Sequence, residues 1–215
     1  MLRLEEALER VLSGVSTLGS EVVSLSEAHG RTLAEDVVAP RSIPPWDNSA
    51  MDGFAVCAQD FEDPPVVLPV LETIAAGSVG DHVVLPGSCA RIMTGAPMPK
   101  GADSVVMVEQ TEDAGNGEIR FLKAVRRGQN VRLKGNDVPE GRCVLERGRR
   151  LDPPAVGLLS SLGLATVSVG RRPVVAILST GDEVIEAGEP LGPGQIYSSN
   201  THSLIGQVLE SGALP

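Results

Sequence analysis

Short valine-rich runs, separated by clusters of glycine, proline and aspartate, dominate the middle of the chain. The runs cover residues 65–71, 82–85, 104–108 and 118–122. Valine favours strands, whereas glycine, proline and aspartate favour turns, so residues 41–137 can form only short strands with tight connections. Hydrophobic residues make up 42% of the chain and aromatic residues only 2%. The sequence therefore predicts a compact β domain whose core is mainly Val, Leu, Ile and Ala.

Helical signals flank this β-rich stretch. Apolar residues recur at helical spacing over residues 2–12, with Glu and Arg elsewhere, which predicts a short amphipathic helix. Asp152, Pro153 and Pro154 form a helix start signal, and Gly163 stands where that helix would stop. Strand-like patterns occupy residues 21–25 and 166–169, and residues 26–30 resemble a capped helical turn.

The last segment reads as the start of an α/β unit. Residues 174–178 are a continuous apolar run, typical of a strand buried on both faces, and a turn-rich loop follows over residues 179–199. We predict a helix over residues 200–210, capped by Asn200. A parallel strand needs neighbours in its sheet, so we expect part of this domain, and part of any active site there, to lie outside these 215 residues.

Charge and cysteine usage exclude several classes of function. Acidic residues outnumber basic ones by 28 to 18, and the net charge of −10 opposes non-specific binding to nucleic acids and anionic membranes. No apolar run approaches the roughly 20 residues that a membrane span requires. The three cysteines are widely separated, and neither they nor the three histidines show a metal-binding spacing. We expect a cytoplasmic protein without disulfides.

Two carboxylates occupy a stiff turn in the motif PPWDNSAMDGFAV, residues 44–56. Pro44 and Pro45 restrict the backbone, and Gly53 tolerates any backbone conformation. Asp47 and Asp52 in such a loop suit binding of a hard cation or proton transfer. Turn formation alone is the alternative, because Asp is common in turns.

Two further loops carry polar groups that suit anion or metal chemistry. In RIMTGAPMP, residues 91–99, the Thr94 hydroxyl and nearby amides could hold an oxyanion, although a plain turn explains the same residues. In VRLKGNDVPEG, residues 131–141, Arg132 and Lys134 precede Asp137. A solvated loop with weak ion pairs is the alternative there.

Hydroxyl and carboxyl groups also follow the apolar run of residues 174–178. The loop STGDE follows the end of the predicted strand, where hydroxyl groups often bind phosphate. Its carboxylates could hold Mg²⁺ at the same place. Its residues are Ser179, Thr180, Gly181, Asp182 and Glu183. Neither GxGxxG nor GxxxxGK[ST] occurs, which argues against dinucleotide and P-loop binding. The stretch GQIYSSN then leads into the N-terminus of the predicted helix, which attracts anions but also suits simple capping.

Taken together, the ordered motifs resemble those of molybdopterin molybdenumtransferases, the family that includes the gephyrin E domain. The motifs are PPWDNSAMDGFAV, RIMTGAPMPKGADSVVMVE, VRLKGNDVPEG, and STGDE followed by PGQIYSSN. The stretch LSEAHGRTLAEDVVAP extends the resemblance across nearly the whole chain, as the N-terminal portion of longer relatives. The family implies an elongated, multidomain α+β fold. It implies an N-terminal helix in residues 1–20 that packs on the third domain, a split first domain (21–40 and 142–170), a β-rich second domain (41–141) and the beginning of an α/β molybdopterin-binding domain (171–215).

The resemblance also implies a reaction and a site. Family members insert molybdate into adenylylated molybdopterin and release AMP with the help of Mg²⁺, as homodimers whose sites combine domains of both subunits. Molybdopterin adenylyltransferase and chaperones of molybdoenzymes are the implied partners. Motif matching assigns activity to Asp52, Thr94, Asp137 and Glu183, metal binding to Asp52 and Asp137, and binding of pterin or phosphate groups to Ser179, Thr180, Gly181 and Asp182.

One departure from the family pattern concerns Ser198, where many relatives have Asp. The substitution removes a negative charge beside the predicted helix, so Ser198 is not assigned to the site. Two other functions use the same features: a dimerising scaffold fragment without catalysis, and a generic Mg²⁺-dependent phosphohydrolase. The phosphohydrolase would release AMP without molybdate. Binding of molybdopterin together with product formation would contradict the scaffold.

Overall fold

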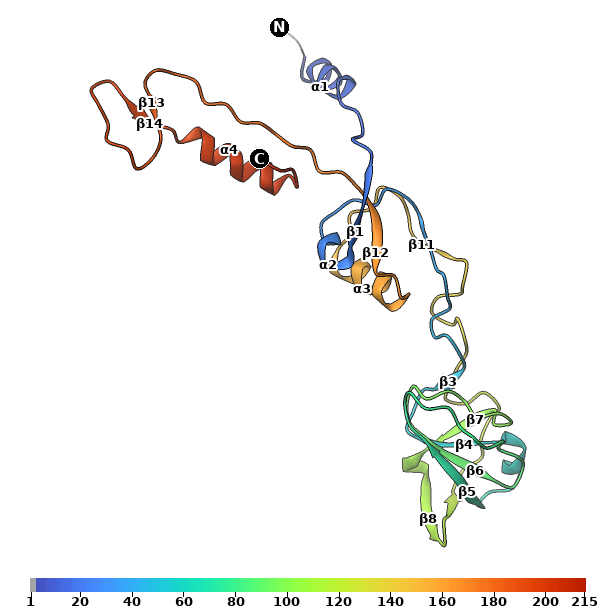
Figure 1. Cartoon of the computed structure of the whole chain (residues 1–215). Coiled ribbons are helices and arrows are strands. Elements are labelled where there is room, and N and C mark those ends of the chain that lie inside the picture. The colour runs from blue at the N-terminus through green and yellow to red at the C-terminus, as the bar shows by residue number, and fades with distance from the viewer. Residues whose placement is uncertain (1–2) are drawn as a thin grey trace. The chain divides into compact units, whose positions relative to one another are not determined.

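The computed structural model describes residues 3–215, which form two compact units. Unit 1 comprises the segments up to Val37 and from Leu145 onward, and unit 2 comprises Val38–Val144. The chain is mostly β structure with few helices (Figure 1). No helix in the described part of the chain is long and apolar enough to cross a membrane. The four-part division drawn from the family resemblance stays a prediction.

Unit 2 is built around a six-stranded sheet, labelled in green and cyan shades in Figure 1, with strand order β7-β4-β6-β5-β9-β8. The strands are β4 (Gly53–Val56), β5 (Val66–Ile74), β6 (Cys89–Ile92), β7 (Ser104–Met107), β8 (Thr111–Gly115) and β9 (Glu118–Phe121). Only the β5–β6 pair is parallel; the other neighbours are antiparallel. The runs at residues 65–71, 104–108 and 118–122 thus form strands, as predicted.

Two apolar clusters form the core of unit 2. One is aliphatic apart from Cys57 and includes Ile74, Val84 and Ile92. The other holds all three phenylalanines of the chain: Phe121 makes edge-to-face contacts with Phe54 at 5.7 Å and with Phe61 at 5.3 Å between ring centroids. The few aromatic residues are therefore concentrated in one cluster, where such pairs add to the free energy of burial.

The prediction of a strand at residues 82–85 is wrong, because other partners take up its backbone groups. The carboxylate of Glu72 accepts from the His82 amide at 2.9 Å, and Ser88 Oγ accepts from the Leu85 amide at 3.2 Å. The Val84 side chain is nevertheless fully buried. The valine pattern thus reports burial here and not a sheet ladder.

Unit 1 contains a two-stranded antiparallel pair, β1 (Ser20–Ser24) with β12 (Thr166–Gly170), beside α2 (Leu25–Ala28) and α3 (Pro153–Ser161). The helix start signal is confirmed, since Asp152 Oδ1 accepts from the Ala155 amide at 2.9 Å. The amphipathic helix is α1 (Leu4–Ser13), and none of its residues is buried. Short strands complete the chain: β2 (Val37–Val38) pairs with β11 (Cys143–Leu145), and β3 (Asn48–Ser49) pairs with β10 (Val131–Arg132). Single-turn helices η1 (Ala58–Phe61) and η2 (Val108–Gln110) lie in unit 2.

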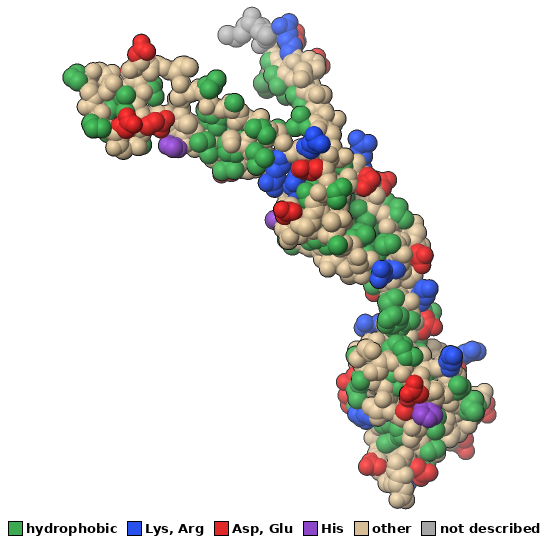
Figure 2. Space-filling view, in the orientation of Figure 1, with side chains coloured by type: hydrophobic (Ala, Val, Ile, Leu, Met, Phe, Trp, Pro, Cys, Tyr) green, Lys and Arg blue, Asp and Glu red, His purple; other side chains and the backbone are tan. Residues whose placement is uncertain are grey.

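The segment after Gly170 departs from the predicted buried strand. Residues 174–178 form no strand; Val174 makes an isolated parallel bridge to Leu214, and Val174 and Leu178 are 78% and 85% exposed. A strand buried on both faces needs a neighbour on each side, and only Leu214 pairs with this run in the described chain. Figure 2 shows hydrophobic side chains over α4 and the segment before it.

The loop of residues 179–199 is more ordered than predicted. It contains a parallel pair of two-residue strands, β13 (Val184–Ile185) and β14 (Ile196–Tyr197). The following helix is confirmed as α4 (Asn200–Glu210), but the cap prediction is wrong: the residue at the N-cap position is Ser199, and its side chain makes no capping hydrogen bond. The hydroxyls near the helix start bond to one another instead, as described below.

Candidate functional site

Three loops that are far apart in the sequence meet on strand β3. We name them loop 1 (residues 43–52), loop 2 (93–99) and loop 3 (131–138). Asn48 and Ser49 pair with Arg132 and Val131 of loop 3. In loop 2, the Gly95 amide donates to Ser49 O at 2.9 Å and the Met98 amide donates to Asp47 O at 2.9 Å. The three motifs of unit 2 therefore form one continuous site, which we call the three-loop site.

The centre of this site is a hydrogen-bonded pair, Asp52 and Thr94. Asp52 Oδ1 accepts from both the Thr94 amide and the Thr94 hydroxyl, each at 2.7 Å. The hydrogen bonds from the Thr94 amide and then from its hydroxyl lower the pKa of Asp52; burial opposes them, and the nearby positive charge of Arg91 adds a lesser lowering effect. Asp52 is exposed, and its Oδ2 has no hydrogen bond within residues 3–215. The pair thus presents an ionised carboxylate with one open oxygen.

Gly53 fixes the position of Asp52. A Cβ at residue 53 would lie 1.9 Å from the carbonyl oxygen of Val106 on the neighbouring strand β7, so only glycine fits. The Val108 amide donates to Asp52 O at 3.1 Å. Close backbone approach on one side and Thr94 on the other hold the Asp52 carboxylate in place.

Loop 3 brings Asp137 and Lys134 to the three-loop site. The Asp137 amide donates to Ile43 O at 3.0 Å, and Asp137 Oδ1 accepts from Asn136 Nδ2 at 3.3 Å. Asp47 Oδ1 accepts from the Lys134 amide at 2.7 Å. Motif matching does not assign Asp47 to the site, although its place in the same motif as Asp52 is a sufficient signal.

Asn48 supplies an unusual buried acceptor in the three-loop site. Its side chain is only 9% exposed, and its Oδ1 is buried without a hydrogen-bond partner in the described part of the chain. A buried acceptor without a partner costs about 1–3 kcal/mol. Such a group is a candidate to accept a hydrogen bond from, or to coordinate, a ligand of this site. The sequence motif by itself does not single out Asn48 as a site residue.

The second group of predicted residues lies in unit 1, around a pocket of about 270 Å³ that we call the hydroxyl pocket. Thr201 Oγ1 is hydrogen-bonded to Ser179 Oγ and, at 2.7 Å, to Ser198 Oγ. Ser179 and Thr180 line the pocket, as does Ser198, which is 6% exposed. Sequence reasoning leaves Ser198 out of the site, but the structure makes its hydroxyl part of this network, which centres on Thr201.

The remaining predicted residues, Gly181, Asp182 and Glu183, follow directly and are exposed. Gly181 has φ 145°, and a Cβ there would lie 2.7 Å from Glu183 Oε2. The glycine therefore leaves space for the Glu183 carboxylate to lie over the backbone. Within unit 2 the structure thus joins Asp52 to Thr94 and holds the Asp137 loop against loop 1. The Ser179–Glu183 loop belongs to unit 1 and forms a separate group.

The oxygen-rich chemistry of the three-loop site suits a hard cation more than a soft one. No group of three or more His, Cys, Asp or Glu side chains able to hold a metal ion occurs among residues 3–215. Asp52 and Asp137 would therefore need ligand oxygens from elsewhere. Mg²⁺ is commonly held in this way, by one or two carboxylates plus water and substrate phosphates.

Comparison with known proteins assigns the family. The family model described as the MoeA N-terminal region (domain I and II) matches residues 2–163. Molybdopterin molybdenumtransferase 2 of Mycobacterium tuberculosis is 44% identical over 195 residues, covering 89% of this chain and 48% of the relative. The molybdopterin molybdenumtransferase of Haemophilus influenzae is 40% identical, covering 100% of this chain and 55% of the relative.

A solved structure is similar over the whole chain. The crystal structure of the molybdopterin biosynthesis moeA protein from Pyrococcus horikoshii OT3 superimposes with a TM-score of 0.91 and 37% identity, covering 100% of this chain and 58% of that one. The chain spans about half the length of the curated relatives it matches. These matches show that the chain belongs to the molybdopterin molybdenumtransferase (MoeA) family and corresponds to the N-terminal portion of such proteins.

Proposed function

We propose that this chain acts in molybdenum cofactor biosynthesis as the part of a molybdopterin molybdenumtransferase that carries the three-loop site and the hydroxyl pocket. The complete protein inserts molybdate into adenylylated molybdopterin and releases AMP, with the help of Mg²⁺. The names of its relatives and its family membership support molybdenum transfer to molybdopterin. The single observation that carries the proposal is the Asp52–Thr94 pair at the junction of three family motifs.

In this proposal the Asp52 carboxylate works as a permanent anion. The two Thr94 donors satisfy Oδ1 and keep the carboxyl ionised, so Oδ2 is available to a cation or to a proton on the substrate. Asp52 and Asp137 would hold Mg²⁺ together with substrate phosphate, and Asn48 Oδ1 offers a neutral oxygen in the same site. When bound, Mg²⁺ would neutralise the negative charge that develops on the phosphate as AMP leaves.

The hydroxyl pocket is proposed to bind pterin or phosphate groups. Ser179 and Thr180 line it, and the network through Ser198 and Thr201 can rotate its O–H groups toward an anion. Gly181 and Asp182 extend this surface, and Glu183 contributes a further carboxylate. The departure from Asp at Ser198 leaves this pocket with hydroxyl donors in place of a negative charge, which favours an anionic ligand.

The architecture and partners of the complete protein belong to the same proposal. Residues 171–215 would begin an α/β molybdopterin-binding domain in an elongated, multidomain α+β protein. The protein would be a cytoplasmic homodimer, and its partners would be molybdopterin adenylyltransferase and molybdoenzyme chaperones.

The test is molybdenum insertion by the full-length transferase that contains this chain, with Asp52→Asn as the variant. Asparagine keeps an oxygen acceptor for the two Thr94 donors but removes the charge, so the fold is retained and insertion from adenylylated molybdopterin, Mg²⁺ and molybdate should fall at least about a hundredfold. Asp60→Asn is the matched control, since Asp60 Oδ2 also accepts a backbone hydrogen bond, from the Gly87 amide at 2.9 Å, outside the three loops. Near-normal insertion by Asp52→Asn would remove Asp52 from the reaction. AMP release without molybdate would favour the phosphohydrolase.

A further inference from the structure

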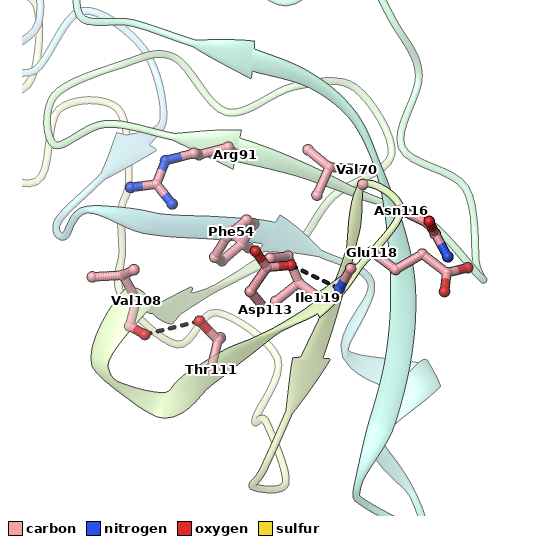
Figure 3. Close-up of a pocket in the computed structure, with 11 residues that line it drawn as sticks. Phe54, Val70, Arg91, Val108, Thr111, Asp113, Asn116, Glu118 and Ile119 are labelled. Atoms are coloured by element: carbon pink, nitrogen blue, oxygen red, sulfur yellow. Dashed lines mark hydrogen bonds between the residues drawn. The ribbon is translucent and has the colours of Figure 1, made fainter.

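A pocket of about 440 Å³ lies on one face of the six-stranded sheet of unit 2, outside the three loops (Figure 3). Side chains from β4, β5, β6, η2 and the β8–β9 hairpin line it. Its volume is within the range of small-molecule sites, roughly 300–1,000 Å³. The function proposed above assigns no ligand to this pocket; one of its lining residues, Arg91, acts there only through its charge near Asp52.

Strand register independently places the key side chains on the same sheet face. Phe54 is directly opposite Arg91 in the β4–β6 pair, Leu68 is opposite Ile119, and Ile119 is opposite Asp113 in the β8–β9 pair. Directly opposite residues project to the same side of a sheet. Phe54 and Leu68 belong to one buried cluster, so this face is the one that carries the phenylalanines.

Arg91 is the cation of this pocket. Its guanidinium carbon lies 5.3 Å from the centroid of the Phe54 ring, which fixes the side chain by a cation–π contact. Within residues 3–215 the Arg91 side chain makes no ion pair or hydrogen bond, so its donors are open to a ligand. A guanidinium with open donors matches a carboxylate.

Asp113 supplies the opposite charge. Its Oδ1 accepts from the Gly115 amide at 2.8 Å, drawn as a dashed line in Figure 3, which holds the carboxylate in place. Its other oxygen makes no hydrogen bond to any residue that the structure describes. Val70, Val108 and Ile119 add apolar walls to the same pocket. In Figure 3 the Glu118 side chain extends to the side of the view away from Arg91, so Asp113 is the better candidate to face the same ligand.

We propose that this pocket binds a small zwitterion with an apolar body, of the α-amino acid type, whose carboxylate pairs with Arg91 and whose ammonium group pairs with Asp113. A simple anion or a simple cation satisfies only one of the two charges. The apolar walls of Val70, Val108 and Ile119 would receive the ligand's side chain.

The test is an NMR titration of the 215-residue chain with L-phenylalanine and L-leucine, following the amides of the 115–117 turn. We expect saturable shifts at millimolar concentration for at least one of them, and binding at least about tenfold weaker for 3-phenylpropanoate and 2-phenylethylamine, which each lack one charge. No saturable change with either amino acid up to about 10 mM would overturn the proposal. Equal binding of a singly charged analogue would also overturn it.

Variants locate the two charges. Arg91→Gln and Asp113→Asn should each weaken binding at least about tenfold, and the amide oxygen introduced by Asp113→Asn can still accept from the Gly115 amide. Glu112→Gln is the matched control, because Glu112 lies on the same strand but outside the pocket and should leave binding unchanged. Amide spectra verify that each variant is folded. Unchanged binding by folded Arg91→Gln or Asp113→Asn would contradict the assignment.

Discussion

Replacing Gly53 by alanine would place a Cβ atom 1.9 Å from the carbonyl oxygen of Val106. The two backbones would have to separate by about 1.1 Å to reach 3.0 Å, a separation below which real Cβ contacts essentially never occur. A hydrogen bond of about 2.9 Å does not survive such a shift. Since Phe54 and Val106 beside it are buried, the lost pairing leaves a donor and an acceptor without partners. We expect Gly53→Ala to destabilise unit 2 by about 2–6 kcal/mol.

Gly95→Ala is the control for this prediction. Gly95 has φ +83°, but a Cβ there meets no atom within 4 Å, so alanine costs only the strain of the left-handed backbone, about 1–2 kcal/mol. Urea unfolding followed by the fluorescence of Trp46, the single tryptophan, reports on unit 2. A loss of stability in Gly53→Ala no greater than that in Gly95→Ala would refute the steric argument for Gly53.

Three other predictions follow from single contacts. Thr94→Val removes the hydroxyl donor and should raise the pKa of Asp52, measured by carboxyl NMR titration; an unchanged pKa would contradict the role of Thr94. Because the pKa of Asp52 is lower in the folded protein, its contribution to stability is present above its unfolded pKa and is lost as pH falls through the folded value. Asp152→Ala should cost about 1 kcal/mol by removing the cap of α3, measured by thermal unfolding, whereas Asp152→Asn should keep most of it. Burial raises the pKa of the Cys89 thiol to about 12, so iodoacetamide at pH 8 should label exposed Cys143 well before Cys89. Mass spectrometry of the peptides measures the labelling, and equal labelling of the two cysteines would mean that the β6 region opens readily.

Predictions from the sequence succeeded where neighbouring residues determine the structure. The start signal at Asp152 predicts α3 because cap and first turn are adjacent in the chain, and the valine runs predict β5, β7 and β9. Prediction failed at residues 82–85 and 174–178, where the outcome depends on distant partners. In the first segment the Glu72 carboxylate accepts from the His82 amide, and in the second only Leu214 pairs with the run within the described chain. An apolar pattern records which side chains suit burial, but it carries no information on which strand lies alongside.

The same distinction applies to the candidate site. Motif composition singles out Asp52 and Thr94, but only the fold shows that both Thr94 donors converge on one carboxylate oxygen. The motif names Asp47 as a candidate carboxylate, but only the fold shows that it accepts from the Lys134 amide. Ser198 is left out of the site because its partner, the Thr201 hydroxyl, becomes relevant only once the loop is placed. The orphan acceptor of Asn48 is a property of burial and has no signature in the sequence.

Strand β3 is only two residues long, yet it is paired on one side with loop 3 and bonded on the other to loop 2. A change in any one loop therefore reaches the other two through a shift of Asn48 or Ser49. Substitutions in different loops should combine with effects that differ from the sum of the single effects, as happens for residues that share partners. The three motifs are thus expected to tolerate exchange between relatives as a set more readily than one at a time.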